Sequence, residues 1–166
     1  MAYFSRRRAF MLGVVLVVGA WFLLPTLCRA PVTPEGRVRA AVVEVADGLS
    51  AGDLGAALAP ISRSYQDADG GDFATVRAIL WRELQSRGPI TVTLGPMEVD
   101  LAEDGSSAQA SFVALLMDGL NVGALDIRAD NADAWHFEVG LELEDDDEWR
   151  IVWHERRGVE PQDVFL

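Results

Sequence analysis

Residues 135–156 read WHFEVGLELEDDDEWRIVWHER, and this stretch decides the fold class. Apolar and polar residues alternate on both sides of a run of acidic residues. This pattern is typical of two β-strands that are joined by a tight, solvated turn. The sequence therefore predicts a β-hairpin with strands at 135–144 and 149–156, closed over residues 145–147.

The apolar residues of the hairpin set its expected register. If Leu143 lies opposite Trp149 and Val139 lies opposite Trp153, the apolar side chains of both strands share one face. This register assigns both histidines to the other, polar face, away from the helices. It pairs the polar residues as Glu142 with Arg150, Glu138 with His154, and His136 with Arg156.

Two further strands are expected upstream. Residues 90–101 alternate apolar residues with threonines and acids, and Gly95-Pro96 interrupts them, which predicts a bulge or bend. After a turn at residues 103–105, residues 108–117 form a second long strand, and residues 118–133 read as a loop. The chain thus ends in an antiparallel sheet of about four long strands.

Three helices are expected before the sheet. Apolar residues recur at helical spacing in residues 34–51, 54–61 and 73–87. Thr33 before Pro34, Asp53 and Asp72 each stand where an N-cap is expected, and Gly88-Pro89 ends the third helix.

Residues 9–27 contain no charged residue and are apolar on every helical face. At 1.5 Å per residue they form a helix of about 28 Å, close to the thickness of a bilayer core. Three arginines in the segment 1–8 precede this helix and only Arg29 follows it, which places the N-terminus in the cytoplasm and the domain in the periplasm. A linker (28–34), a domain (35–158) and a C-terminal tail (159–166) complete the predicted organisation.

The N-terminal segment has other readings. Val18-Gly19-Ala20 fits a signal-peptidase site, so the chain could instead be secreted after cleavage. Arg7-Arg8 resembles a twin-arginine export signal, and Cys28 resembles a lipidation site, although Leu27 is bulky for one. All these readings place the domain outside the cytoplasm, and we favour a single-pass inner-membrane anchor.

Charge and cysteine content exclude several classes of protein. From residue 35 onward, 26 acidic residues face 10 arginines, a net charge of −16, and the chain has no lysine. A surface this negative repels phosphate backbones, so we expect no nucleic-acid binding. Cys28 is the sole cysteine, which excludes an intrachain disulfide and a multi-cysteine zinc site. The composition is typical of a GC-rich bacterial genome.

From residue 35 to residue 157 the chain resembles the nuclear transport factor 2-like (NTF2-like, SnoaL-like) superfamily. The resemblance lies in Ser64-Tyr65-Gln66-Asp67 with Gly70 before the third helix, and in residues 148–152, which read EWRIV. It implies an α+β cone in which the helices and the concave sheet face enclose a pocket, and a homodimer formed through the sheet. It implies no single activity, because this fold serves both enzymes and binding modules.

Tyr65, Asp67 and Asp69 are the candidates for acid–base catalysis, with an aspartate as base and the tyrosine polarising a carbonyl. Turn and cap hydrogen bonds explain the aspartates more simply, and no catalytic set is complete. Tyr65, Trp81 and Trp135 are the residues we expect to line a ligand pocket. No residue pattern indicates a cofactor or a metal site.

The sequence thus predicts a membrane-anchored NTF2-like domain that binds a small apolar ligand or an envelope protein without catalysis. The alternatives are a small-molecule isomerase or dehydratase that acts in the cone, and a structural dimerisation module.

Overall fold

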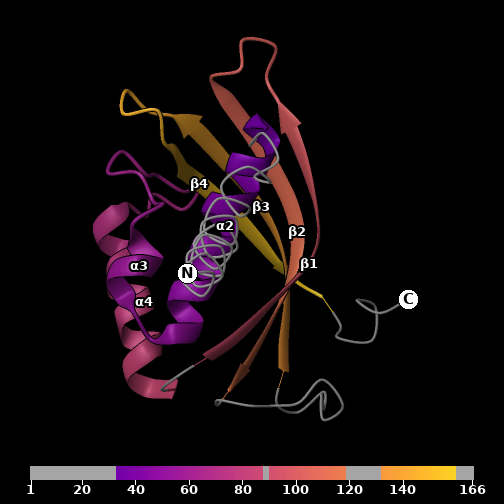
Figure 1. Ribbon diagram of the computed structural model, residues 1–166. Coiled ribbons are helices and arrows are strands. Elements are labelled where there is room, and N and C mark those ends of the chain that lie inside the picture. The colour runs from indigo at the N-terminus through magenta and orange to yellow at the C-terminus, as the bar shows by residue number, and fades with distance from the viewer. Residues whose placement is uncertain (1–32, 88–89, 119–131, 160–166) are drawn as a thin grey trace, which may run out of the picture. The chain divides into compact units, whose positions relative to one another are not determined.

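The computed structural model describes residues 33–87, 90–118 and 132–159. Over these ranges the chain forms three helices followed by four antiparallel strands, which confirms the predicted α+β class. Figure 1 shows the helices on one side of a curved sheet. The helices are α2 (Pro34–Ala51), α3 (Leu54–Leu58) and α4 (Phe73–Arg87), and the strands are β1 (Ile90–Leu101), β2 (Ser107–Asp118), β3 (Ala132–Leu143) and β4 (Trp149–Gly158).

Aspartate caps start α3 and α4 where the sequence predicts them. Asp53 Oδ1 accepts a hydrogen bond from Ala56 N at 3.1 Å. Asp72 Oδ1 accepts from both the amide and the hydroxyl of Thr75, each at 2.8 Å. These bonds satisfy amide groups that have no partner within the first helical turn.

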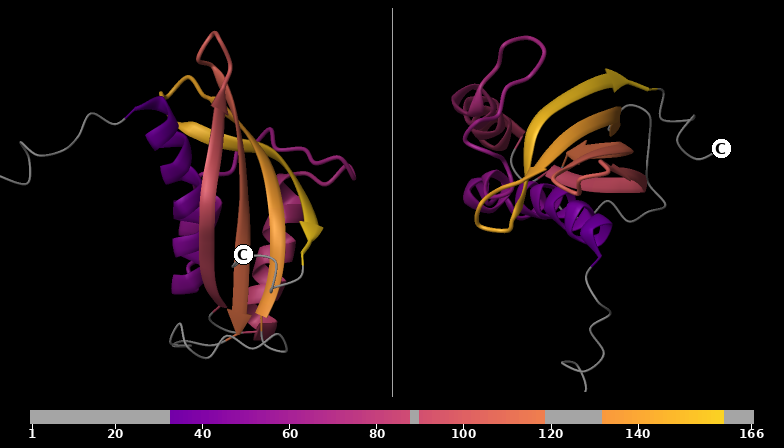
Figure 2. Two further views of the ribbon diagram at one scale, coloured as in Figure 1. Left: turned by 90° about the vertical axis from the view of Figure 1, so that its right-hand side faces the viewer. Right: turned by 90° about the horizontal axis from the view of Figure 1, so that it is seen from above.

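The sheet is a meander in the order β1-β2-β3-β4, and its concave side faces the helices (Figure 2). The predicted irregularity at Gly95-Pro96 is confirmed, because the β1–β2 register shifts between Leu94 and Met97. Leu94 and Met97 both pack against the core as a result, although simple alternation would place them on opposite faces.

The β3–β4 hairpin keeps the predicted register only near its turn. Leu143 pairs with Trp149, and Glu142 pairs with Arg150, as expected. Farther along β4, the bulged residue Val152 shifts the register by one residue. Three predicted pairs are therefore wrong: Val139 pairs with His154 instead of Trp153, Glu138 with Glu155 instead of His154, and His136 with Arg157 instead of Arg156.

This shift turns His154 toward the helices. A slip of one residue reverses the face on which every later side chain of a strand lies. His136 stays on the outer face, as predicted, and its Nε2 lies 3.1 Å from the hydroxyl of Ser111. The assignment of His154 to the same polar face is wrong.

An extended segment between α3 and α4 holds the bulge in place. Ile151 N donates to Pro60 O at 2.8 Å, and Ser62 N donates to Ile151 O at 2.9 Å. Gln66 N donates to the carbonyl of the bulged Val152 at 2.9 Å. Residues 60–66 thus cover the edge of β4 and satisfy backbone groups that an open edge would leave unpaired.

Gly140 accommodates the shifted strand on the outer face. A Cβ atom at this position would overlap the indole of Trp153. The absence of a side chain lets the indole lie close to the backbone of its register partner, Gly140. A glycine inside a strand often marks such a close approach.

The core fills the narrow part of the space between helices and sheet. Val38 of α2 and Leu141 of β3 are almost completely buried, and Ile61 and Trp149 close the core toward β4. The predicted membrane segment 9–27 and the tail from residue 160 lie outside the described residues. Among the described residues, no helix is long and apolar enough to cross a bilayer.

Candidate functional site

Tyr65 lies on the extended segment before α4 and points at β4. Its hydroxyl forms a short hydrogen bond with His154 Nδ1, and the two ring centroids are 5.9 Å apart. Tyr65 is only 3% exposed, whereas His154 is partly exposed. The bulge in β4 therefore brings together a buried phenol and a partly accessible imidazole.

The pKa values of both groups favour their neutral forms. Burial raises the pKa of Tyr65 to about 12, and the nearby charge of Asp67 acts in the same direction. Burial also lowers the pKa of His154, helped by the positive charge of Arg156. At neutral pH both groups are neutral, so the phenol can donate to Nδ1 of the imidazole tautomer that carries its proton on Nε2.

Phe137 lies next to this polar pair on the concave face, and two more aromatic side chains, Phe112 and Trp135, follow on β2 and β3. The ring centroid of Phe137 lies 6.2 Å from that of His154, and Phe137 stacks on Phe112 at 5.6 Å. The guanidinium of Arg156 lies 4.8 Å from the ring centroid of Trp135. Such surroundings suit a flat apolar molecule that carries one polar atom.

The burial of side chains on the concave face decreases from the core toward one end of β3 and β4. Phe112 is buried, but Trp135, Phe137 and His154 are partly exposed, and Arg156 is exposed. We call these four partly exposed or exposed residues the open end of the concave face. Trp135, one of the three residues predicted to line a pocket, belongs to this group.

The two aspartates that the sequence names as candidate bases belong to the turn before α4. Asp67 Oδ1 accepts hydrogen bonds from Asp69 N at 3.0 Å and from Gly71 N at 2.6 Å. Asp67 therefore shapes the turn before α4 and acts on Tyr65 through its charge alone. Asp69 is exposed.

Trp81 lies apart from Tyr65 and Trp135. It is 56% exposed and, with Ile79 and Arg82, lines a shallow groove on the outer face of α4. The structure therefore does not unite the three residues that the sequence places in one pocket.

A polar cluster next to the hairpin turn was not predicted. Arg150 Nε lies 2.7 Å from Glu144 Oε2, and its NH1 donates to Ala59 O at 3.0 Å. Asp146 contacts the same guanidinium. The buried hydroxyl of Ser62 donates to Glu144 Oε1 at 2.6 Å. This cluster ties the turn to the end of α3, and one arginine in it contacts two carboxylates.

His154 is the site residue that sequence reasoning missed. The prediction did not include the bulge at Val152, and regular alternation along β4 places residue 154 on the outer face. Gly140 was the available signal, because a glycine inside a strand indicates a bulge or a close contact.

No family model and no curated protein matches this sequence. Solved structures do match. A proposed dehydratase of the NTF2-like family from Streptomyces avermitilis is 12% identical with a TM-score of 0.61, over 78% of this chain and 99% of that one. An NTF2-like protein with a cystatin-like fold from Novosphingobium aromaticivorans is 14% identical with a TM-score of 0.58, over 90% and 95% of the two chains.

A third match is a proposed scytalone dehydratase from Novosphingobium aromaticivorans, which is 10% identical with a TM-score of 0.57, over 74% of this chain and 82% of that one. At these identities the matches establish the fold, which is NTF2-like, as the sequence resemblance indicates. Activity has to be argued from the site.

Proposed function

We propose that this domain binds a small, flat, largely apolar molecule at the open end of the concave face. The observation that carries the proposal is the hydrogen bond between buried Tyr65 and partly exposed His154, set among aromatic rings. A polar pair on an otherwise apolar surface is the usual arrangement by which a binding site orients its ligand.

The ligand contacts follow from the protonation states. With Nδ1 accepting from Tyr65, the His154 Nε2–H group is the donor that remains for a ligand oxygen. The rings of Phe137 and Trp135 supply apolar contact area, and Arg156 supplies a positive charge nearby. We therefore expect a ring compound with a hydroxyl, carbonyl or carboxylate group.

Binding of 2-naphthol to the full chain in detergent micelles tests this proposal. His154→Gln should weaken binding roughly fivefold or more, because one hydrogen bond is worth about 1 kcal/mol. Glu155→Gln is the matched control, since Glu155 is the next residue of β4 and is exposed. If naphthol binds equally well to the natural chain and to His154→Gln, or shifts no resonance of Phe137, the proposed site is wrong.

An acid–base isomerase or dehydratase is the second candidate. The neutral His154 supports it, because in the tautomer whose Nδ1–H donates to Tyr65 Oη the lone pair of Nε2 is free to accept a proton near neutral pH. Two of the structurally similar proteins carry dehydratase names, which agrees with this candidate. In this version His154, rather than Asp67 or Asp69, is the base.

Exchange of the α-protons of 2-tetralone in deuterated buffer tests the catalytic candidate. Exchange that depends on His154 but not on Glu155 would support catalysis. If the protein binds naphthol but the exchange is no faster than in buffer alone, the catalytic candidate is wrong and ligand binding is the supported function.

We also propose that residues 9–27 anchor the domain to the inner membrane, with the domain on the periplasmic side. The uncharged segment and the arginines before it support this topology. Cys28, the only cysteine, follows the segment and should react with a membrane-impermeant maleimide in intact spheroplasts. Loss of the first 20 residues from the mature chain would show cleavage instead.

A further inference from the structure

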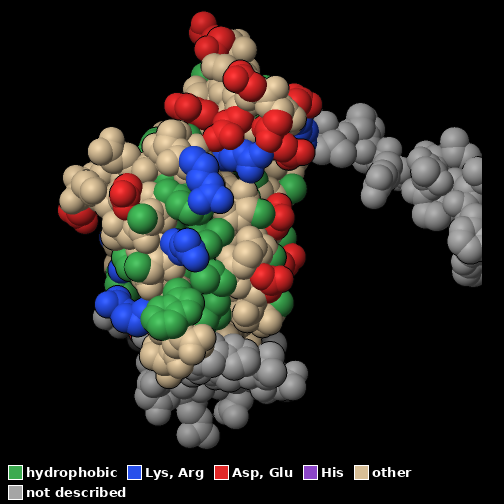
Figure 3. Space-filling model, turned by 90° about the vertical axis from the view of Figure 1, so that its left-hand side faces the viewer, with side chains coloured by type: hydrophobic (Ala, Val, Ile, Leu, Met, Phe, Trp, Pro, Cys, Tyr) green, Lys and Arg blue, Asp and Glu red, His purple; other side chains and the backbone are tan. Residues whose placement is uncertain are grey.

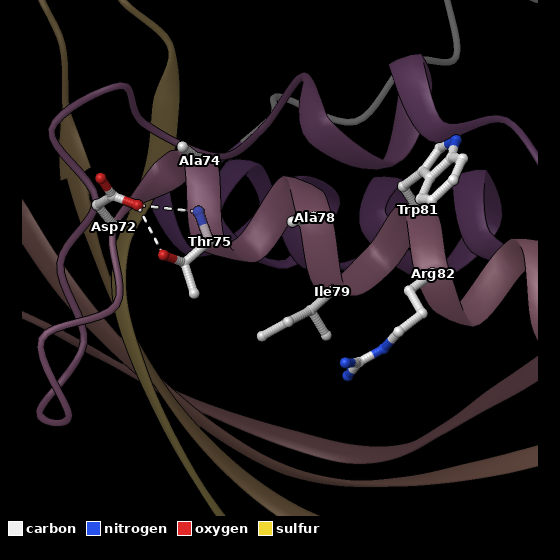
Figure 4. Close-up of a pocket in the computed structure, with 7 residues that line it drawn as sticks. All are labelled: Asp72, Ala74, Thr75, Ala78, Ile79, Trp81 and Arg82. Atoms are coloured by element: carbon white, nitrogen blue, oxygen red, sulfur yellow. Dashed lines mark hydrogen bonds between the residues drawn. The ribbon is translucent and has the colours of Figure 1, made fainter.

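The outer face of α4 presents apolar side chains to solvent. Ile79 is 39% exposed and Trp81 is 56% exposed, both unusually high values for large apolar residues of this domain. Figure 4 shows Trp81 on one side of the helix and Ile79 and Arg82 on the other, with Ala74 and Ala78 between them. The small alanines form the floor of a shallow groove that another helix can approach closely.

Opposite charges stand at the two ends of this groove. Asp72 lines one end and Arg82 the other. The Arg82 side chain is 70% exposed, and its ion pair with the adjacent Glu83 is stretched to 4.0 Å. Asp72 uses Oδ1 to cap the helix, and the carboxylate is exposed. Both charges are therefore available to a partner.

The spacing of these residues makes the face complementary to itself. Asp72, Thr75, Ile79 and Arg82 follow one another at intervals of three, four and three residues, so they share one stripe of the helix. Residue 77 is the midpoint both of positions 72 and 82 and of positions 75 and 79. If two α4 helices pack antiparallel with residue 77 of each at the centre, each aspartate meets the partner's arginine, and each isoleucine meets the partner's threonine.

The outer face of the sheet offers a less suitable surface for a second copy. Glu98, Ser111, Glu138 and Glu155 lie side by side across the four strands. Packing two sheets face to face would bring six carboxylates from this row together. The like charges would have to be desolvated without cationic partners in the row.

The residues around the groove also make the α4 face a better surface for a second copy than the outer face of the sheet. Figure 3 shows the face of the molecule that carries α4, where hydrophobic and basic side chains lie together in the middle while acidic side chains gather at the top of the view and along its right-hand edge. The α4 face thus combines apolar area with both signs of charge, in a domain that is otherwise strongly acidic.

We propose that the outer face of α4 binds the same face of a second copy of this chain, in an antiparallel arrangement about a two-fold axis near residue 77. Each dimer contains two Asp72–Arg82 ion pairs at the rim, with Thr75 and Ile79 from both copies between them. The partner is a second copy because the same stripe, read in the opposite direction, places an arginine against each aspartate and a threonine against each isoleucine.

Reversal of one charge tests the pairing. Arg82→Glu should weaken self-association of the full chain in detergent micelles about tenfold, since two exposed ion pairs become two repulsive contacts. Arg157→Glu is the matched control: it replaces an exposed arginine of β4, alters the net charge equally and does not line the groove. Sedimentation velocity across a concentration series measures both dissociation constants. Equal effects of the two substitutions would overturn the proposal.

Cysteine cross-linking locates the interface. In a Cys28→Ser background, Ala78→Cys stands next to the proposed axis and should give a covalent dimer on mild oxidation, whereas Glu138→Cys on the outer sheet face should not. Cross-linking of Glu138→Cys but not Ala78→Cys would show the sheet-mediated dimer instead. A natural chain that stays monomeric at millimolar concentration would also overturn the α4 interface.

Discussion

Tyr65 and His154 lie 89 residues apart in the sequence, yet their side chains share a hydrogen bond between Oη and Nδ1. This contact joins the segment before α4 to the last strand of the sheet. It requires the bulge at Val152, because the regular register would turn His154 to the opposite face. The candidate site and the irregular hairpin are therefore one structural feature.

The Tyr65–His154 bond should be visible as an energetic coupling. Tyr65→Phe should lower the free energy of unfolding by about 1–2 kcal/mol, because the imidazole Nδ1 loses its donor. His154→Gln should have a similar effect. In urea unfolding, the stability lost by the double variant should be smaller than the sum of the two single losses by about 0.5–1.5 kcal/mol. Strict additivity would mean that the two side chains do not interact in solution.

The stability of the domain should depend on pH through His154. Its pKa in the folded state is lowered, so between that value and the unfolded value near 6.5 the unfolded chain binds more protons. The free energy of unfolding should therefore decrease as the pH falls below about 6.5, and level off below the folded pKa. The carboxylates titrate in both proteins, so the difference between the natural chain and His154→Gln isolates this effect. A pH-independent difference would contradict it.

Gly140→Ala should destabilise the hairpin. The new Cβ atom overlaps the Trp153 indole, and overpacking of this kind costs about 1–3 kcal/mol. Thermal or urea unfolding measures the loss, and Trp153→Ala in the same chain should recover part of it. Gly158→Ala is the matched control in β4, since its Cβ atom would lie 3.9 Å from the Trp135 ring, an ordinary contact. Equal effects of the two substitutions would argue against the shifted register.

Arg150→Ala should lower stability by about 1–3 kcal/mol, because it leaves Glu144 and the Ala59 carbonyl without their cationic partner. Arg157→Ala, which removes an exposed arginine from the other end of β4, should change the free energy of unfolding by less than about 0.5 kcal/mol. High salt should not abolish the loss at Arg150, since its side chain is only 25% exposed. A loss that vanishes in salt would indicate a purely surface ion pair.

The local structure of this protein could be predicted because it depends on neighbouring residues. Asp53 and Asp72 cap helices through amides three residues ahead, and Gly95-Pro96 interrupts a strand through its own backbone limits. The turn-proximal register of the hairpin followed from matching the apolar faces near Leu143 and Trp149. Each of these features requires information from only a short stretch of the chain.

The sequence by itself determined the order of helices and strands, the caps, the turn and the resemblance to an NTF2-like cone. Only the tertiary structure decided where His154 points and which side chains meet. The face on which His154 lies is set by the bulge at Val152. The distant segment 60–66 holds this bulge with hydrogen bonds to β4. Such non-local bonds override the alternation of a strand, and for this reason Tyr65 meets a histidine while Trp81 faces solvent.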